Sequence, residues 1–157
     1  MNVLFLCTGN SARSILAEAI LNAKGGRRLA AYSAGSHPKG EVHPLALAVL
    51  KTCDIPIAGL HSKSWESFAG DSVPHMDVVI TVCDRAAAES CPLWPGAPVK
   101  VHWGLPDPAA AEGGDAERLA AFATTFTALE RRIDLLLGLP LEYLSPDELE
   151  QQLRALA

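Results

Sequence analysis

The sequence lacks the hydrophobic runs that a membrane protein needs. A membrane-spanning helix takes about 20 consecutive apolar residues, and the 157 residues contain no run of that length. The amino-terminal stretch Met1–Cys7 also lacks the charged segment and the long apolar core of a secretory signal peptide. We therefore expect a cytoplasmic protein with no membrane partner.

Basic residues are outnumbered by acidic ones. Lys and Arg total 13 against 18 Asp and Glu, so the formal net charge is −5 at pH 7. Proteins that bind nucleic acid or anionic lipid surfaces through charge need a basic surface, so the balance argues against nucleic acid as a partner. It leaves room for a small anionic substrate in a locally positive pocket.

Cysteine is scarce as well, with four residues in the chain. In a reducing compartment these are free thiols, and any disulfide is more easily catalytic than structural. The sequence shows no repeat, linker or low-complexity stretch, and 49% of its residues are hydrophobic. This composition predicts one folded domain over residues 1–157.

Short apolar runs alternate with segments of helical periodicity. The predicted strands cover residues 2–6, 29–33, 76–82 and 99–103. The predicted helices cover residues 11–22, 43–53, 115–137 and 145–156, with a single turn at 64–68. Strands that read as continuous apolar runs between helices are typical of a parallel sheet covered on both faces. The sequence thus predicts an α/β domain with a central four-stranded parallel sheet and helices on both faces.

Three chemically capable side chains follow predicted strands. Cys7, Cys83 and Asp107 lie at or just after strand ends, and the carboxyl ends of parallel strands meet at the edge where such sheets bind ligands. We expect these three residues to converge on one rim. By contrast, Cys53 closes the apolar face of the helix predicted at 43–53, and we expect it to be a buried core residue.

The densest motif lies between the first predicted strand and helix. Its residues are Cys7, Thr8, Gly9, Asn10, Ser11, Ala12, Arg13 and Ser14. Backbone N–H groups of so short a loop, with the helix N-terminus, can surround a tetrahedral oxyanion. The Arg13 guanidinium can bind two oxygens of the same anion. The same positive surroundings favour a Cys7 thiolate nucleophile. The alternative is a buried cysteine beside an unrelated arginine, but the flanking elements and the Gly-Asn-Ser core argue against it.

This motif resembles that of the low-molecular-weight protein tyrosine phosphatase superfamily. Its motif is Cys-x5-Arg-Ser near the N-terminus with a late Asp-Pro that supplies a general acid, here Asp107 and Pro108. Within the superfamily, the chain is more similar to arsenate reductases, which carry two further cysteines after the third strand, here Cys83 and Cys91. The phosphatases usually place a Tyr after Asp-Pro, whereas Ala109 stands here. Further matching pieces are 33–35, 42–44, 62–65, 82–84 and 102–104.

The resemblance implies arsenate as substrate and phosphate as a related ligand. Cys7 attacks the arsenic, Asp107 protonates the departing oxygen, and Cys83 then attacks the Cys7 sulfur, which releases arsenite. Cys91 resolves the resulting disulfide, and thioredoxin, itself reduced through NADPH, reduces the Cys83–Cys91 pair. No tightly bound cofactor is implied, and the expected state is a monomer. Ala12 replaces a second cysteine that such loops often carry, which favours Cys83 as the attacking thiol.

Several readings stay open at this point. A phosphatase would need Cys7, Arg13 and Asp107 but neither Cys83 nor Cys91, and a non-enzymatic oxyanion sensor would need no turnover at all. Glutathione and glutaredoxin are alternative reductants, although an internal cysteine pair favours thioredoxin. Asn10, Glu18 and Ser33 match positions that support the loop or bind potassium in some relatives, and the sequence assigns no metal. His102 and Trp103 are expected to shape the rim near Asp107.

A disulfide between Cys83 and Cys91 limits the distance between their Cα atoms. If it is helical throughout, eight steps of about 1.5 Å place the two Cα atoms roughly 12 Å apart, whereas a disulfide needs about 4.4–6.8 Å. We therefore expect this segment, which is poor in apolar bulk, to unwind or fold back during a catalytic cycle.

Overall fold

The computed structural model describes residues 1–70, 73–89 and 94–157. Four parallel strands form one sheet in the order β2-β1-β3-β4. They are β1 (Asn2–Cys7), β2 (Ala30–Gly35), β3 (Val78–Thr81) and β4 (Val99–His102). The α/β class and the four-stranded parallel sheet are confirmed, and the strand ends lie within two residues of the predicted ones.

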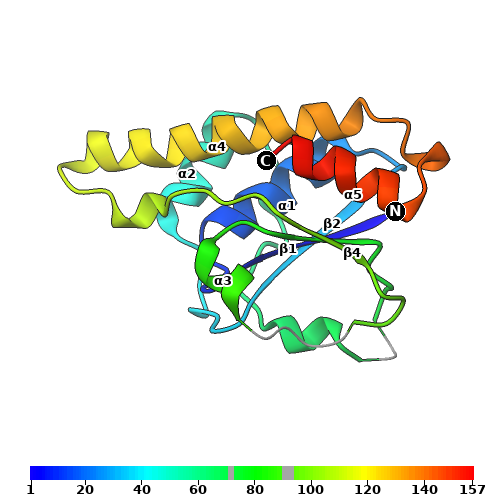
Figure 1. Ribbon diagram of the computed structural model, residues 1–157. Helices are drawn as coiled ribbons and strands as arrows, with labels where there is room; N and C mark the ends of the chain where they lie inside the picture. Colours follow the sequence, from blue (N-terminus) through cyan, green and yellow to red (C-terminus); the bar gives the residue numbers. More distant parts are fainter. Residues whose placement is uncertain (71–72, 90–93) are drawn as a thin grey trace.

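Four helices pack on one face of the sheet (Figure 1). They are α1 (Arg13–Lys24), α2 (Pro44–Thr52), α4 (Asp115–Leu137) and α5 (Pro146–Ala155). Side chains from alternate strand positions, such as Val3, Phe5 and Ile80, face these helices and are fully buried or nearly so. Burying one such large side chain stabilises the fold by about 1.5–3 kcal/mol, so this layer is the main core.

The opposite face carries a smaller apolar cluster. Leu4, Leu6 and Val79 point to this side, where Phe68 and Trp94 cover them. Phe68 belongs to the short 3₁₀ helix η1 (Trp65–Phe68), which Ser64 caps, since its hydroxyl accepts the Glu66 N–H at 3.2 Å. Both faces of the sheet are therefore covered, which is why the strands read as unbroken apolar runs.

The remaining short elements are α3 (Asp84–Ala88), η2 (Pro108–Ala110) and η3 (Leu141–Tyr143). A capping box begins α5: the Ser145 hydroxyl accepts the Glu148 N–H, and the Glu148 carboxylate accepts the Ser145 N–H. No helix in the described parts of the chain is both long enough and apolar enough to span a membrane.

The prediction for Cys53 was wrong, because its side chain is exposed. Helix α2 ends at Thr52, and Asp54 takes a positive φ of 57°. The chain therefore leaves the helix before Cys53 can join the apolar face, and that face ends instead at Val49 and Leu50, which are buried.

The chain direction places a crevice beside β1. It runs from β1 outward to β2 and then returns to the other side of β1 for β3. Loops after β1 and β3 therefore diverge at the carboxyl edge, the position at which open parallel sheets bind ligands.

Candidate active site

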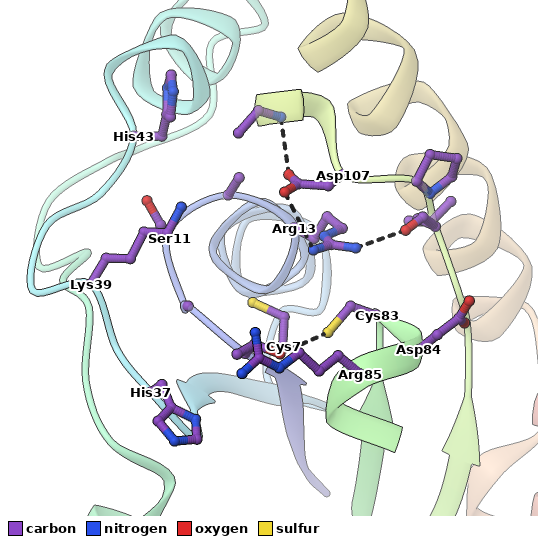
Figure 2. Close-up of a pocket in the computed structure, with 16 residues that line it drawn as sticks. Cys7, Ser11, Arg13, His37, Lys39, His43, Cys83, Asp84, Arg85 and Asp107 are labelled. Atoms are coloured by element: carbon purple, nitrogen blue, oxygen red, sulfur yellow. Dashed lines mark hydrogen bonds and ion pairs between the residues drawn. The ribbon is translucent and has the colours of Figure 1, made fainter. Parts of the chain in front are cut away.

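A pocket of about 640 Å³ opens at this carboxyl edge. The loop after β1, residues 7–14, forms its floor and is called the oxyanion loop below. Cys83, which follows β3, and Asp107, which follows β4, line the same pocket (Figure 2). The structure thus brings together the three strand-end residues that the sequence singled out.

The oxyanion loop is held from outside through its carbonyl groups. The backbone N–H groups of His37, Lys39 and His43 donate to carbonyl oxygens of this loop, each at 2.9 Å. Their acceptors are the oxygens of Thr8, Gly9 and Ser11, respectively. Because each carbonyl points opposite to the N–H of the same peptide plane, this pattern turns loop N–H groups toward the pocket, as an oxyanion site requires.

The oxyanion loop also lies very close to the end of β2. A Cβ atom added to Gly35 would lie only 2.5 Å from the Thr8 carbonyl oxygen and 3.0 Å from the Asn10 nitrogen. Asn10 takes a positive φ of 43°, a conformation that Asn tolerates better than most residues. The glycine at the end of β2 therefore lets that strand approach the loop at van der Waals distance.

The Cys7 sulfur is buried and receives two polar contacts. The Asn10 backbone N–H donates to Sγ at 3.2 Å, and the Ser14 hydroxyl lies 2.9 Å from it. Both contacts suit a sulfur that carries negative charge, because a thiolate accepts hydrogen bonds but donates none. The position of Cys7 at the floor of the pocket directs this sulfur toward any bound oxyanion (Figure 2).

Arg13 is the first residue of α1 and is held in place by the chain after β4. Its Nη1 donates to the Leu105 carbonyl at 2.9 Å, and its Nη2 lies 3.9 Å from Asp107 Oδ2. The guanidinium is mostly buried, with 16% of the side chain exposed. An always-charged planar group at the pocket wall is suited to bind two oxygens of one anion.

Asp107 caps η2 and faces the pocket. Its Oδ1 accepts the Ala109 N–H at 3.0 Å, which leaves Oδ2 directed toward Arg13. With 42% of its side chain exposed, the carboxyl group can exchange protons with water, as a general acid must between turnovers.

Cys83 places a second thiol in this pocket. Its sulfur caps α3 by accepting the Ala86 N–H at 3.4 Å and lies 3.6 Å from the Thr8 hydroxyl. Thr8 is the neighbour of Cys7 in the oxyanion loop, so both sulfurs face the same space (Figure 2). Helix α3 ends at Ala88, before Cys91, and Cys91 itself lies outside the described residues.

A buried ion pair supports the oxyanion loop from below. Lys63 Nζ lies 3.6 Å from Glu18 Oε1, and only 14% and 11% of the two side chains are exposed. Burial raises the pKa of Glu18, an effect that Lys63 and Ser33 oppose. Burial lowers the pKa of Lys63, which the Glu18 carboxylate opposes. The Lys63 ammonium therefore lies beside oxygens of Glu18 and Ser33, two of the three residues whose positions bind potassium in some relatives.

Sequence analysis missed the cationic rim. Lys39 and Arg85 line the pocket together with His37 and His43. Burial, with Arg118 and Lys39 nearby, lowers the pKa of His43. The rim lysine and arginine create the local positive pocket inside an acidic chain. Their spacing in the sequence carries no motif, so composition alone could not have identified them.

The expectation for His102 and Trp103 was wrong. Trp103 is fully buried, and its Nε1 donates to the Leu153 carbonyl at 2.8 Å. It continues the inward-facing alternation of Val101 on β4, so it belongs to the core. His102 contacts Asp84 Oδ1 at 2.8 Å, and this pair ties the start of α3 to β4 instead of shaping the rim near Asp107.

Comparison with known proteins places this fold and loop in a defined class. The family model described as low molecular weight phosphotyrosine protein phosphatase matches residues 2–154. The chain belongs to this family.

Three proteins similar to this chain are two arsenate reductases and a phosphatase. An arsenate reductase of Halalkalibacterium halodurans is 37% identical over 131 residues, which cover 83% of this chain and 91% of that protein. A thioredoxin-dependent arsenate reductase of Corynebacterium glutamicum is 28% identical with a TM-score of 0.56, covering 86% of this chain and 62% of that one. A low-molecular-weight protein tyrosine phosphatase from T. tengcongensis is 27% identical with a TM-score of 0.68, covering 88% and 98%.

Proposed function

We propose that this protein reduces arsenate to arsenite through a relay of three thiols. One observation carries the proposal: the Cys83 thiol lies in the same pocket as the Cys7 nucleophile, beside Thr8 of the oxyanion loop. Hydrolysis of a phosphate ester needs one thiol, whereas a two-electron reduction needs a second thiol within reach of the first. The sequence relative from H. halodurans, itself an arsenate reductase, supports the same reading.

The first step forms a sulfur–arsenic bond. The Cys7 thiolate attacks arsenate held by the loop N–H groups and Arg13, and one arsenate oxygen leaves as water after taking a proton from Asp107. The product is a Cys7 thioester of arsenic(V). The second step breaks that bond: Cys83, as a thiolate, attacks the Cys7 sulfur, and the electron pair of the S–As bond passes to arsenic. Arsenite leaves, and a Cys7–Cys83 disulfide remains.

The third step regenerates the nucleophile. Cys91 attacks Cys83, which frees Cys7 and leaves a Cys83–Cys91 disulfide for an external dithiol to reduce. Thioredoxin is the proposed reductant, supported by the thioredoxin-dependent neighbour from C. glutamicum, and no tightly bound cofactor takes part. Helix α3 is short, and its Ala86 is buried while Asp84 and Arg85 are exposed, so release of this helix from the pocket costs little free energy.

Repeated reduction of these thiols requires a reducing compartment, so we propose that the protein acts in the cytoplasm.

A weaker phosphatase activity is the second candidate. Arsenate and phosphate share shape and charge, and the oxyanion loop, Arg13 and Asp107 would handle a phosphate ester in the same manner. Within the described part of the chain, the pocket is lined by no Phe, Tyr or Trp. Because an aryl phosphate finds no such ring to pack against here, we expect weak binding of phosphotyrosine.

The test measures two reactions on one set of variants. Arsenate-dependent NADPH oxidation is followed with thioredoxin and its reductase, and p-nitrophenyl phosphate hydrolysis is followed in parallel. We expect Cys83→Ser and Cys91→Ser to abolish steady-state arsenate reduction while hydrolysis persists, and Cys53→Ser to change neither. Arsenate reduction that persists in Cys83→Ser would overturn the three-thiol relay, and arsenate reduction that is absent in the wild type would leave the phosphatase as the function.

A further inference from the structure

The His102 side chain on β4 contacts the chain on both sides of Cys83. Its Nδ1 lies 2.7 Å from the Thr81 hydroxyl, two positions before Cys83, and its Nε2 lies 2.8 Å from Asp84 Oδ1, one position after it. Thr81 is the last residue of β3, and Asp84 is the first residue of α3. One imidazole ring thus joins the end of the strand to the start of the helix across Cys83.

The hydrogen bonds of this ring follow from the chemistry of its partners. An ionised carboxylate accepts hydrogen bonds and donates none, so His102 Nε2 carries a proton and donates it to Asp84. In the neutral ring, Nδ1 is then the acceptor, and the Thr81 hydroxyl donates to it. Both ring nitrogens therefore have a partner, which fixes the orientation of the ring.

The chain is anchored more firmly before Cys83 than after it. The Val82 N–H donates to the Leu6 carbonyl at 2.8 Å, and the Val82 carbonyl accepts the Leu105 N–H at 3.1 Å. After Cys83, the helix α3 has five residues, of which Ala86 is buried. The contact between the first residue of this short helix and the imidazole ring is therefore a large part of its attachment to the sheet.

The two side chains at this junction point in opposite directions. The Cys83 sulfur points toward Cys7, whereas the Asp84 carboxyl group points away from it (Figure 2). Cys83 has an extended backbone, with φ −134° and ψ 148°, and consecutive side chains of an extended chain alternate in this way. A rotation that takes Asp84 away from the ring therefore also turns the sulfur, which is buried in the structure, out of the pocket.

Gly104 leaves the space that this contact needs. A Cβ atom added to Gly104 would lie 2.7 Å from His102 Nε2 and 2.8 Å from Asp84 Oδ1. Carbon atoms do not approach nitrogen or oxygen so closely, so one or both side chains would have to move. Both have room to do so, because 39% of the His102 side chain and 94% of the Asp84 side chain are exposed. A methyl group at this position would thus separate the pair.

We propose that His102 is a positioning residue for the second thiol: its contacts with Thr81 and Asp84 hold the Cys83 sulfur in the pocket, facing Cys7. The inference rests on the proposed function, in which the Cys83 thiolate attacks the Cys7 sulfur. In that step the S–S bond forms as the S–As bond breaks, and the electron pair of the broken bond passes to arsenic. Attack requires the two sulfurs to be close and aligned, so a Cys83 that leaves the pocket for part of the time attacks more slowly.

The test compares two rates in a Cys91→Ser background. Formation of the Cys7–Cys83 disulfide at saturating arsenate is followed by acid quench and disulfide mapping, and p-nitrophenyl phosphate hydrolysis, which does not use Cys83, is followed in parallel. We expect His102→Leu to slow disulfide formation about three- to fivefold, near the upper end of what an exposed ion pair contributes, and to leave hydrolysis unchanged. In His102→Gln, the side-chain amide can still donate to Asp84, so most of the rate should return.

A second readout needs no arsenate. Iodoacetamide reaches Cys83 when its sulfur is outside the pocket, so the alkylation rate follows the population of that open state. We expect His102→Leu to raise Cys83 alkylation, located by peptide mass, by about the same three- to fivefold factor. Gly104→Ala should do the same without changing either partner of the contact. Alkylation of Cys7 should stay at the wild-type rate in both variants.

The matched control is Lys100→Leu. Lys100 is exposed and lies two positions before His102, on the same side of β4. Its ammonium lies 5.6 Å from the centre of the Trp94 ring. We expect this variant to keep the wild-type rates of disulfide formation, hydrolysis and Cys83 alkylation, and all variants to unfold at the wild-type temperature.

Three results would overturn the inference. The first is unchanged Cys83 alkylation in both His102→Leu and Gly104→Ala. The second is faster alkylation without slower disulfide formation, because the contact would then stabilise α3 without serving the reaction. The third is an equal loss of disulfide formation and hydrolysis, which would indicate damage to the whole site. Failure of the proposed function has a different signature: the wild type would form neither arsenite nor the disulfide, while the differences in Cys83 alkylation persisted.

Discussion

The role of Asp107 can be tested by a change that keeps its shape and removes its proton. In Asp107→Asn, the amide oxygen can still accept the Ala109 N–H, so η2 retains its cap. The lost ion pair with Arg13 is long, at 3.9 Å, and the aspartate is 42% exposed. Such a pair contributes at most about 1 kcal/mol, which corresponds to roughly a fivefold change. Loss of a general acid costs about 10²- to 10⁴-fold, so the two explanations differ by more than an order of magnitude.

The assay compares two phosphate esters that differ in their leaving group. Phenolate is basic and needs a proton as it departs, whereas p-nitrophenolate leaves readily without one. We expect kcat of Asp107→Asn to fall at least about 100-fold on phenyl phosphate and clearly less on p-nitrophenyl phosphate. A loss below about tenfold on both esters, or an equal loss on both, would refute the assignment of Asp107 as the acid. Thermal unfolding of the variant serves as the control, and it should match the wild type.

Two other predictions test the supports of the site, and a third tests the exposed position of Cys53. Gly35→Ala should lower both the unfolding temperature and the Cys7 alkylation rate, because its methyl group would press on the Thr8 carbonyl at 2.5 Å; wild-type values of both would contradict the close approach. The His43 ring caps α2 by accepting the Leu45 N–H at Nδ1, which requires the neutral ring. Its pKa is lowered below the ordinary 6.5, mainly by burial, so this stabilisation is present above pH 6.5 and is lost as the pH falls through the lowered value. A cap contributes about 1 kcal/mol, or roughly 2–4 °C in a chain of this size. His43→Asn, which caps without titrating, should reduce the difference in unfolding temperature between pH 5 and pH 7.5 by about that amount, and an unchanged difference would exclude the cap. Cys53→Ser, at an exposed position, should change the free energy of unfolding by no more than about 0.5 kcal/mol, as measured by urea denaturation.

The order of elements could be predicted because local patterns determine it. Apolar runs of strand length, the caps at Ser145 and His43 and the stop at Gly138 each specify their own segment, and the structure places these elements as predicted, with boundaries that shift by one or two residues. The convergence of Cys7, Cys83 and Asp107 followed from parallel topology alone.

The errors arise where tertiary packing decides. Cys53 matched a helical face, but the helix ended one residue earlier. Trp103 was expected to shape the rim near Asp107, but it lies two positions after Val101 and faces the same core. Lys63 belongs to a stretch that matched the family, yet only the folded chain shows that its ammonium lies beside Glu18, 45 positions earlier in the sequence.

A single turnover without an external reductant tests the thiol relay itself. Reduced Cys91→Ser protein is mixed with one equivalent of arsenate, quenched with acid and alkylating agent, and digested for disulfide mapping. We expect one equivalent of arsenite and a Cys7–Cys83 disulfide, because the thiol that would resolve this disulfide is absent. Arsenite without that disulfide, or a disulfide that joins Cys7 to Cys53, would contradict the relay.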